Sequence, residues 1–222
     1  VRTLAARDRP LLLALTATAN ERVAEDIQAQ LAVPKGDRLL AQDGSPEGSV
    51  GPAITVLRQS AKRENLRLGV VRASSYAQKL AYTEAFARST RGSTLIYCAT
   101  RDHVETVAAY LSSRGLQTLA YHAGFEAEQR TAMERGFIGD THPRMVATNA
   151  LGMGIDKPNL RAVLHFDLPG SITAYYQEMG RAGRDGRASR CVLLFDPADA
   201  RVQEHFIDTA QPGRSEFATV LE

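Results

Sequence analysis

Short apolar runs alternate with stretches of helical spacing along most of the chain. From residue 66 onward the runs have the length of buried strands and the stretches between them the length of helices. The pattern predicts strands at 66–71, 93–99, 116–121, 144–148, 162–166 and 191–195, and helices at 76–88, 102–114, 126–138, from 171 onward and at 198–207. Apolar strands that alternate with helices are typical of a parallel sheet covered on both faces, so the predicted fold class is α/β.

The first part of the chain follows a different pattern. Residues 11–19 (LLLALTATA) are predicted to form a buried strand, and Asn20 is placed to cap a helix that reaches about Val33. Residues 43–52 (DGSPEGSVGP) are rich in glycine, serine and proline and are predicted to be a flexible loop or linker, followed by a short strand at 53–57. The piece before this linker is too small for a domain, and we expect it to be the end of another one.

The composition is that of a globular protein. Twenty-seven Lys and Arg residues against 25 Asp and Glu give a formal charge of +2, and 44% hydrophobic with 23% charged residues excludes disordered and fibrous classes. Cys98 and Cys191 lie far apart inside apolar runs, so reduced core thiols are predicted, and a disulfide framework or four-cysteine metal site is excluded within this chain. No apolar run approaches the ~18 residues of a membrane span, and residues 1–8 lack a signal-peptide layout. We therefore expect a cytoplasmic protein with no membrane partner.

The stretch most informative for chemistry is 175–187, YYQEMGRAGRDGR. We place it on a helix that begins at Ser171. That helix is predicted to carry Ile172, Tyr175, Tyr176 and Met179 on its apolar side, and Gln177, Gly180, Arg181 and Arg184 on the opposite side. Two guanidinium groups held toward an anion are the device that neutralises phosphate charge in phosphoryl transfer. A solvated basic helix end is the alternative, but the Q-x-x-G-R-x-G-R arrangement favours the functional interpretation.

The chain contains, in order, the segments LALTATA (13–19), STLIYCATRDHVE (93–105), AYHAG (120–124), MVATNALGMGIDKPNLRAVLHFDLP (145–169) and QEMGRAGRDG (177–186). These segments resemble motif III, motif IV, the segment after it, motif V with its following strand, and motif VI of the RecQ family, which are superfamily 2 ATP-dependent DNA helicases. Gln177 favours this family over DEAD-box RNA helicases, which usually have His-Arg at that place and S-A-T where this chain has T-A-T.

The resemblance implies a fold and an organisation. Residues 1–42 would be the C-terminal remnant of a first RecA-like domain, and 43–65 a linker. Residues 66–210 would be the whole second RecA-like domain, a parallel sheet with helices on both faces, and 211–222 the start of a following segment. Residues 60–66 read SAKRENL where family members tend toward S-F-D-R-P-N-L, which suggests a variant inter-domain linker.

The resemblance also implies roles for residues near the nucleotide. Arg184 would be the leading arginine finger, with Arg181 and Gln177 assisting catalysis. Gly154 and Asp156 would join the two arginines in binding the nucleotide, since the glycines of GMGID allow tight turns and close approach to phosphate or ribose. Thr16 and Thr18 would couple the ATP and DNA sites; the alternative for these two is a locally bonded strand hydroxyl.

Four residues are candidates for a nucleic-acid groove. Thr148 and Asn149 follow the carboxyl end of a predicted strand, where open α/β sheets bind ligands. Arg101 and His122 follow two other strands at equivalent positions, so the four residues could contact the phosphates and sugars of a single strand. Two alternatives stay open: Arg101 as a surface residue at a helix start, and His122 as a hydrogen-bonded loop histidine.

The sequence lacks parts that such an enzyme needs. It contains no G-x-x-x-x-G-K-[ST] and no D-E-x-H box, so the phosphate cradle, its lysine and the usual magnesium carboxylate are absent. ATP and Mg²⁺ would be held mainly by the missing first domain, and the chain alone is predicted to be inactive. The family's cysteine-rich zinc module is not in the chain, so neither zinc nor another metal site is predicted within it.

The predicted function is that of part of an ATP-dependent DNA helicase that moves 3′ to 5′ on single-stranded DNA and unwinds duplex DNA. The resemblance implies a role in DNA repair and recombination in the bacterial cytoplasm or nucleoid. The partners would be single-stranded and duplex DNA and the first RecA-like domain of the same protein. The alternatives are an RNA helicase of superfamily 2 and a non-catalytic nucleic-acid-binding RecA-like module. Motif III argues against the second, because that strand belongs to a domain-one sheet.

Overall fold

The structure is a computed structural model that describes residue 16 and residues 21–31, 62–139, 143–151 and 155–210. The chain divides into two units, residues 1–61 and 62–222. In the first unit, the predicted helix is confirmed as α1, Glu21–Leu31, and Thr16 is exposed. The strand predicted at 11–19, the coupling residue Thr18, the loop at 43–52 and the strand at 53–57 lie outside the described residues.

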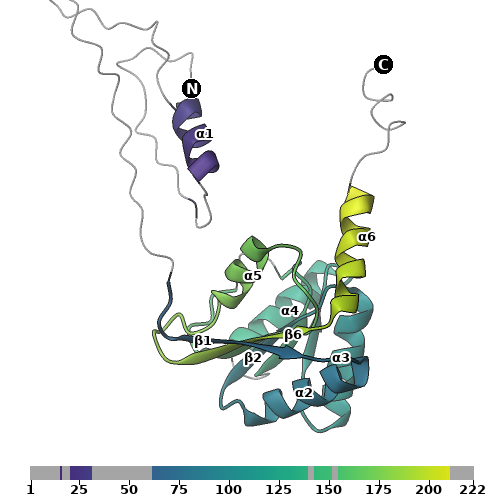
Figure 1. The fold of residues 1–222 in the computed structure, drawn as a ribbon. Helices are drawn as coiled ribbons and strands as arrows, with labels where there is room; N and C mark the ends of the chain where they lie inside the picture. Colours follow the sequence, from purple (N-terminus) through teal and green to yellow (C-terminus); the bar gives the residue numbers. More distant parts are fainter. Residues whose placement is uncertain (1–15, 17–20, 32–61, 140–142, 152–154, 211–222) are drawn as a thin grey trace, which may run out of the picture. The chain divides into compact units, whose positions relative to one another are not determined.

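The second unit is built on a six-stranded sheet (Figure 1). Its strands are β1 Leu66–Arg72, β2 Ser93–Tyr97, β3 Leu119–Tyr121, β4 Arg144–Ala147, β5 Leu160–His165 and β6 Ser189–Phe195. They lie in the order β1-β6-β5-β2-β4-β3, and every pair of neighbours is parallel. The predicted parallel α/β sheet is therefore confirmed over residues 66–195.

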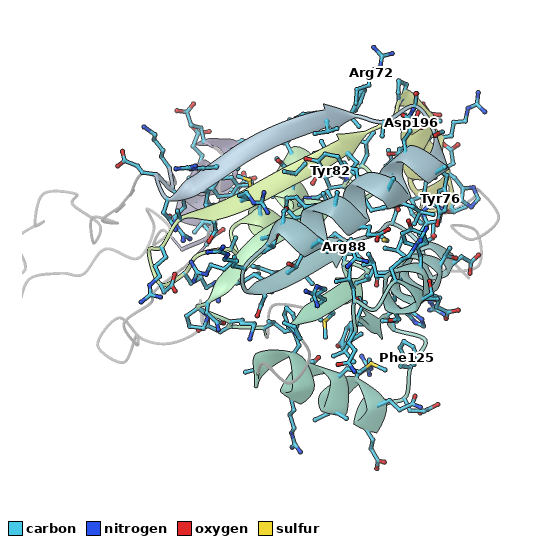
Figure 2. The ribbon with its side chains drawn as sticks, turned by 90° about the horizontal axis from the view of Figure 1, so that it is seen from below. Arg72, Tyr76, Tyr82, Arg88, Phe125 and Asp196 are labelled. Atoms are coloured by element: carbon cyan, nitrogen blue, oxygen red, sulfur yellow. The ribbon has the colours of Figure 1, made fainter. Side chains whose placement is uncertain are left out.

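Helices cover both faces of this sheet. Their bounds are α2 Tyr76–Ser89, α3 Arg101–Ser113, α4 Ala127–Ile138, α5 Ile172–Met179 and α6 Ala200–Ala210, with a 3₁₀ turn at Pro197–Asp199. Helices α2 and α3 pack on one face, and α4 and α5 on the other (Figure 1). Figure 2 shows the view onto α2, with Tyr82 and Arg88 along that helix and Phe125 ahead of α4.

The central strands are apolar on both faces, which explains their continuous hydrophobic runs. All five residues of β2 are buried. Ile96 packs with α2 and α3, whereas Leu95 and Tyr97 pack with α4 and α5. Alternate residues of a strand point to opposite faces, so each central strand contributes to two separate cores.

The strand predicted at 116–121 is half as long as expected. Strand β3 begins at Leu119 rather than at Leu116. Helix α3 ends in a Schellman motif, in which the Gly115 amide donates to Ser112 and the Leu116 amide donates to Leu111, each at 3.0 Å. Gly115 has a φ of 78°, as this motif requires. Leu116 closes the helix, so its apolar side chain belongs to the core without belonging to a strand.

Cys98 and Cys191 are both buried and free, as predicted from their apolar surroundings. Burial raises the pKa of both thiols, that of Cys191 to about 12. Both are therefore protonated at neutral pH and act as small apolar groups of the core. A search of the described residues finds no helix that is both long and apolar enough to cross a membrane.

Candidate functional site

The carboxyl ends of three neighbouring strands bring together most of the predicted groove residues. Tyr97, Ala147 and Tyr121 are aligned at the ends of β2, β4 and β3. Thr148 follows β4 directly, and His122 follows β3 directly. Arg101 begins α3, shortly after β2, and is exposed. The structure thus places these residues at one edge of the sheet, and their part in a nucleic-acid groove stays a prediction.

His122 is a buried residue of this edge, with 4% of its surface exposed. Its Nε2 lies 3.0 Å from a Glu105 carboxylate oxygen, and its Nδ1 accepts a hydrogen bond of 3.1 Å from the Gly124 amide. Its ring stacks on Phe125 at 4.2 Å between centroids. Because both ring nitrogens are engaged within the chain, His122 holds the loop in place, the alternative that the sequence left open.

The same loop places Arg101. A Cβ atom added to Gly124 would lie 2.9 Å from the His122 ring and 3.3 Å from Nη1 of Arg101. The absence of a side chain at Gly124 thus lets the imidazole and the guanidinium approach one loop residue. Arg101 is the exposed cation of this group, and His122 is the buried residue beneath it.

Thr148 and Asn149 differ in accessibility. Thr148 is buried: its amide donates to the Tyr121 carbonyl at 3.1 Å, and its hydroxyl accepts from the Ala150 amide at 3.3 Å. Asn149, the next residue, is exposed. The Thr148 hydroxyl therefore shapes the turn after β4, and the Asn149 side chain is presented to solvent.

A charged cluster at the neighbouring strand ends was not predicted. Asp167 follows β5, and one of its carboxylate oxygens accepts from the Ala99 amide and lies 2.8 Å from Nδ1 of His103. Lys79 of α2 is buried and contacts both Asp167, at 3.6 Å, and Asp199, at 2.6 Å. The sequence offers one sign of this cluster, which is that Asp167 follows a predicted strand. It does not show the partners of Asp167, because they lie more than 60 residues away.

Motif VI does not lie on one continuous helix, which corrects the prediction. Ser171 caps α5 as expected, but the helix ends at Met179 with Gly180 as its C-cap. The amide of Gly183 donates to the Leu160 carbonyl at 2.9 Å, at the first residue of β5, instead of continuing the helix. Gly183 has a φ of 57°, in the left-handed region that favours glycine. Ile172, predicted on the apolar side of the helix, is 88% exposed.

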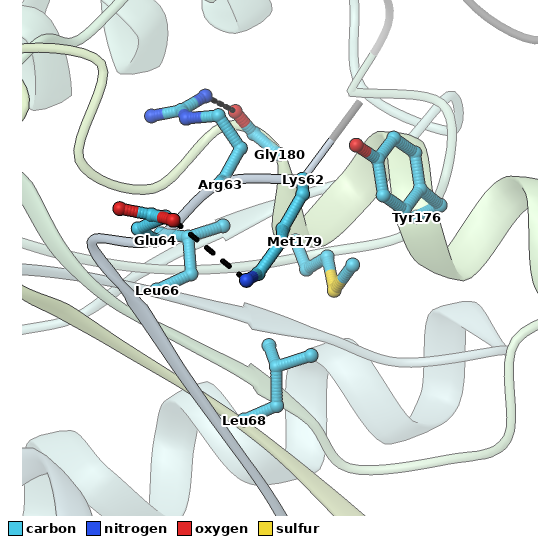
Figure 3. A pocket seen from close by; sticks show the side chains of 8 residues that line it. All are labelled: Lys62, Arg63, Glu64, Leu66, Leu68, Tyr176, Met179 and Gly180. Atoms are coloured by element: carbon cyan, nitrogen blue, oxygen red, sulfur yellow. Dashed lines mark hydrogen bonds and ion pairs between the residues drawn. The ribbon is translucent and has the colours of Figure 1, made fainter. Parts of the chain in front are cut away.

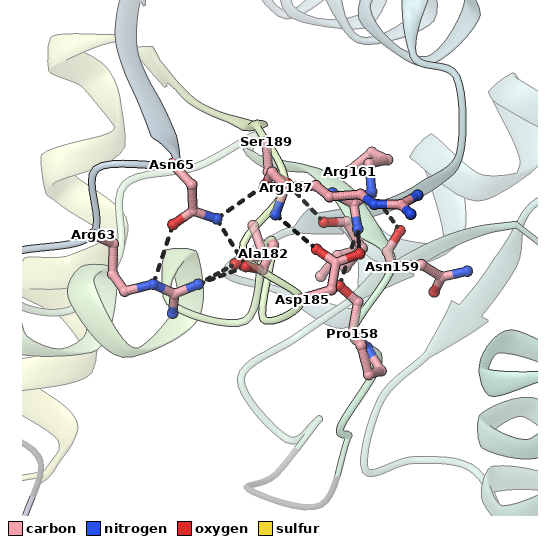
Figure 4. Close-up of polar contacts among 11 residues, drawn as sticks. Arg63, Asn65, Pro158, Asn159, Arg161, Ala182, Asp185, Arg187 and Ser189 are labelled. Carbon is pink, nitrogen blue, oxygen red and sulfur yellow. Dashed lines mark hydrogen bonds and ion pairs between the residues drawn. The ribbon is translucent and has the colours of Figure 1, made fainter.

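Residues 180–187 therefore form a turn outside the helix, which we call the arginine turn (Figure 4). The Asp185 amide donates to Pro158 at 3.3 Å, and the Asp185 carboxylate accepts from the Arg161 guanidinium. These bonds fix the turn against the start of β5.

Two of the three arginines of the turn, Arg181 and Arg184, lie close enough to the Tyr97 hydroxyl to affect its pKa. Burial raises the pKa of the Tyr97 hydroxyl, while the charge of Arg181, a side-chain contact with Arg181 and the charge of Arg184 act in the opposite direction. Nε and Nη1 of Arg181 are buried and make no hydrogen bond of good geometry among the described residues. Arg184 is 38% exposed and donates to the exposed Asp156 carboxylate at 2.9 Å. The turn thus brings together three predicted nucleotide-site residues; Gln177 is exposed on α5, and Gly154 lies outside the described residues.

A pocket of about 460 Å³ lies between residues 62–68 and the end of α5 (Figure 3). It is lined by Lys62, Arg63, Glu64, Leu66, Leu68, Tyr176, Met179 and Gly180. None of the predicted site residues lines it. Its relevance is that Arg63, from the predicted linker, reaches the carbonyl of Gly180 across it.

Residues 77–186 match the family model "Helicase conserved C-terminal domain". The chain is 37% identical over 205 residues to ATP-dependent DNA helicase RecQ of Bacillus subtilis, covering 92% of this chain and 31% of the relative. It is 36% identical over 206 residues to RecQ-like DNA helicase BLM of Xenopus laevis, covering 92% of this chain and 14% of the relative. The chain belongs to the RecQ family. It spans about a third or less of the length of these two relatives.

The fold agrees with this assignment. Yeast Dbp5 bound to RNA and ADP BeF3 superimposes with a TM-score of 0.64 at 21% identity, over 87% of this chain and 47% of that one. The RecQ segment is thus a helicase C-terminal, RecA-like domain, as the motifs implied. At this identity the likeness concerns the fold alone.

The close approach at Gly183 can be tested by substitution. A Cβ there would lie 2.6 Å from the Asn65 amide nitrogen, 2.7 Å from the Ser189 hydroxyl and 2.8 Å from the Arg187 carbonyl. We expect Gly183→Ala to lower the free energy of unfolding by an overpacking penalty of about 1–3 kcal/mol beyond the strain of its positive φ. Gly186→Ala is the matched control, because Gly186 also has a positive φ but nothing within 4 Å. Equal losses in urea denaturation would show that the contacts do not matter.

The pair His103–Asp167 predicts a pH dependence. The hydrogen bond that His103 donates to the Asp167 carboxylate, together with the charge of Asp167, raises the pKa of His103; burial and Lys79 oppose this shift, and Asp199 assists it. Tyr76 covers the ring at 5.3 Å between centroids. Because the folded pKa lies above the unfolded one, the pair's stabilisation is fully present below the unfolded pKa and is lost as the pH rises through the folded pKa.

We expect the difference in unfolding free energy between the original chain and His103→Asn to narrow over that pH range. Asn keeps a donor near Nδ1 but does not titrate, and every other titrating group is common to both proteins. Urea denaturation from pH 5 to 9 measures this difference. A difference that stays constant with pH would show that His103 does not titrate against Asp167.

Proposed function

We propose that this RecQ segment is the second RecA-like domain of an ATP-dependent DNA helicase that moves 3′ to 5′ on single-stranded DNA and unwinds duplex DNA. The arginine turn carries the proposal, because it holds two guanidinium groups at one place without neutralising both. The names of the relatives, ATP-dependent DNA helicases, support it. In the proposed organisation, residues 1–42 end a first RecA-like domain, 43–65 link the two, and 211–222 begin a following segment.

The residues of the turn fit a polyphosphate. Arg181 has buried nitrogens with unmet hydrogen-bonding capacity, and Arg184 has an exposed fork whose partner, Asp156, is 70% exposed. An exposed ion pair of this kind contributes little stability, so Arg184 can exchange Asp156 for a phosphate at small cost. ATP supplies the phosphoanhydride bond whose hydrolysis drives movement. Magnesium and most of the phosphates would be held by the first domain, since this sequence has no phosphate-binding loop.

In this proposal Arg184 is the leading arginine finger. Its planar guanidinium would meet the negative charge that builds on the transferring phosphoryl group. Arg181 would add a second charge from the same turn, and Gln177 would assist from the end of α5. Asp156 and Gly154 would bind the nucleotide from the loop between β4 and β5.

The proposed DNA groove lies at the carboxyl ends of β2, β3 and β4. Arg101 and Asn149 are exposed there and would contact phosphates and sugars directly. His122 and Thr148 are buried and would act by holding the loops that carry those contacts. Thr16 and Thr18 of motif III would couple this groove to the nucleotide. An RNA substrate is not proposed, because the likeness to RNA-bound Dbp5 concerns the fold alone.

The finger assignment predicts a specific kinetic defect in the complete helicase. Arg184→Ala should lower ATP turnover on the order of 10³–10⁵-fold while leaving DNA affinity and the melting temperature nearly unchanged, because a finger acts mainly in the transition state. Arg184→Lys should rescue poorly, since a point charge does not reproduce the fork. Arg187→Ala, three residues away and exposed, is the matched control and should turn over ATP normally.

Steady-state kinetics measure the ATP turnover of each variant, and thermal melting checks that each variant is folded. Arg181→Ala should also impair turnover, and its effect should be non-additive with that of Arg184→Ala. The 222-residue chain by itself should show no DNA-stimulated ATPase activity. Normal turnover in Arg184→Ala together with loss in Arg181→Ala would reassign the finger, and normal turnover in both would overturn the proposed site.

The groove assignment predicts a salt effect. Binding of single-stranded DNA should be sequence-independent and should weaken steeply with salt. Arg101→Ala should reduce the slope of log affinity against log salt by about 0.7, the value for one phosphate contact on a single strand. Arg91→Ala is the control, because Arg91 is an exposed arginine before the opposite end of β2. If both variants gave the same slope in a fluorescence titration, Arg101 would not contact the DNA.

A further inference from the structure

Two residues from the start of the second unit, Arg63 and Asn65, bind the arginine turn (Figure 4). The Arg63 guanidinium donates to the carbonyls of Gly180, Ala182 and Gly183, at 3.5, 3.3 and 2.7 Å. The Asn65 side-chain amide donates to the carbonyls of Gly183, at 2.8 Å, and Arg187, at 2.9 Å. Nε of Arg63 donates to the Asn65 side-chain oxygen at 3.3 Å, so the two residues also hold one another.

These contacts satisfy carbonyls of the turn that follows α5. Carbonyls at the end of α5 itself already accept from the amides of residues 180–182. The carbonyls of the turn instead receive a donor from 117 to 120 positions earlier in the chain, and the Gly183 carbonyl accepts from the nearby Gly186 amide as well. The Gly183 carbonyl receives both Arg63 and Asn65, so the residue between the two arginines is the most firmly held point of the turn.

The backbone of Asn65 ties the turn to the sheet as well. Its carbonyl accepts from the Ser189 amide at 2.9 Å, at the first residue of β6. The Ser189 hydroxyl donates to the Leu160 carbonyl at 3.2 Å, and that carbonyl also accepts from the Gly183 amide. The starts of β1, β5 and β6 thus form one frame around Gly183.

We propose that Arg63 and Asn65 form a clamp, a pair of positioning residues that set where Arg181 and Arg184 stand. The clamp does not bind the side chain of either arginine; it binds backbone carbonyls on both sides of them. The inference rests on the proposed function of the arginine turn. It assigns to the predicted linker a direct part in arranging the finger.

The clamp stands where the chain enters the second unit. Arg63 is the second residue of that unit, which begins at Lys62.

The test uses the complete helicase with Arg63→Ala, Arg63→Lys and Asn65→Ala. A misplacement of about 1 Å costs on the order of 10²-fold in rate, so we expect Arg63→Ala to lower kcat by about that factor with little change in KM for ATP or in DNA affinity. Arg63→Lys should recover only part of the loss, because an ammonium cannot reach three carbonyls in one plane. Arg67→Ala, an exposed arginine on β1, is the matched control and should behave as the original protein.

A second readout does not depend on turnover. Amide hydrogen exchange of the 222-residue chain should be faster at residues 180–189 in Arg63→Ala and unchanged in Arg67→Ala. If Arg63→Ala does not fold, both kcat and hydrogen exchange are measured on Arg63→Lys instead. In the Arg184→Ala background, Arg63→Ala should lower kcat by a smaller factor than in the original protein, because the part of its effect that acts through Arg184 is already lost.

The outcomes separate the two proposals. If Arg184→Ala abolishes turnover but Arg63→Ala matches the Arg67→Ala control in kcat, the clamp inference is overturned and the finger stands. Additive losses in the double variant would also overturn it, because they would place Arg63 on another route. If Arg184→Ala leaves turnover intact, the proposed function fails at the finger, and faster exchange in Arg63→Ala would then show only a structural role.

Discussion

The hydrogen bond from the Gly183 amide to the Leu160 carbonyl decides how motif VI is presented. An α-helix would direct this amide to Met179, and the chain would continue with both arginines on a helical face. By bonding instead to the first residue of β5, the chain leaves α5 and folds back onto the beginning of the sheet. The amides of Arg181 and Ala182 already bond three rather than four residues back, and the bond of Gly183 to Leu160, with the positive φ of Gly183, completes the departure from the helix.

The backbone of the arginine turn and the proposed groove are held at opposite ends of the sheet. The arginine turn rests on Leu160 and Ser189, the first residues of β5 and β6. The groove residues and Asp167 follow the last residues of β2, β3, β4 and β5. Strand β5 is buried almost throughout and pairs with both β2 and β6. A close-packed strand of this kind transmits displacement rather than absorbing it, so it provides a physical connection between the two ends.

The strands and helices of the second unit were predictable because their signals are local. Continuous apolar runs identified β2, β4, β5 and β6, and capping residues such as Ser171 marked helix starts. The course of the chain after α5 was not predictable from a period of 100° per residue, since it is held by a bond to Leu160, more than 20 residues earlier. Glu105, which faces Nε2 of His122, and the partners of Asp167 were missed for the same reason: they are close in space but distant in sequence.

Arg63 and Asn65 show the same limit and one available signal. Their partners lie more than 110 residues away, so no local pattern indicates the contact. Yet SAKRENL departs from S-F-D-R-P-N-L while keeping the arginine and the asparagine, the two residues that bind the turn. A linker that served only as a spacer would have no physical need for either side chain. A guanidinium can satisfy several carbonyls in one plane, and an amide can donate and accept at once, which is what a turn with unpaired carbonyls and a neighbouring arginine requires.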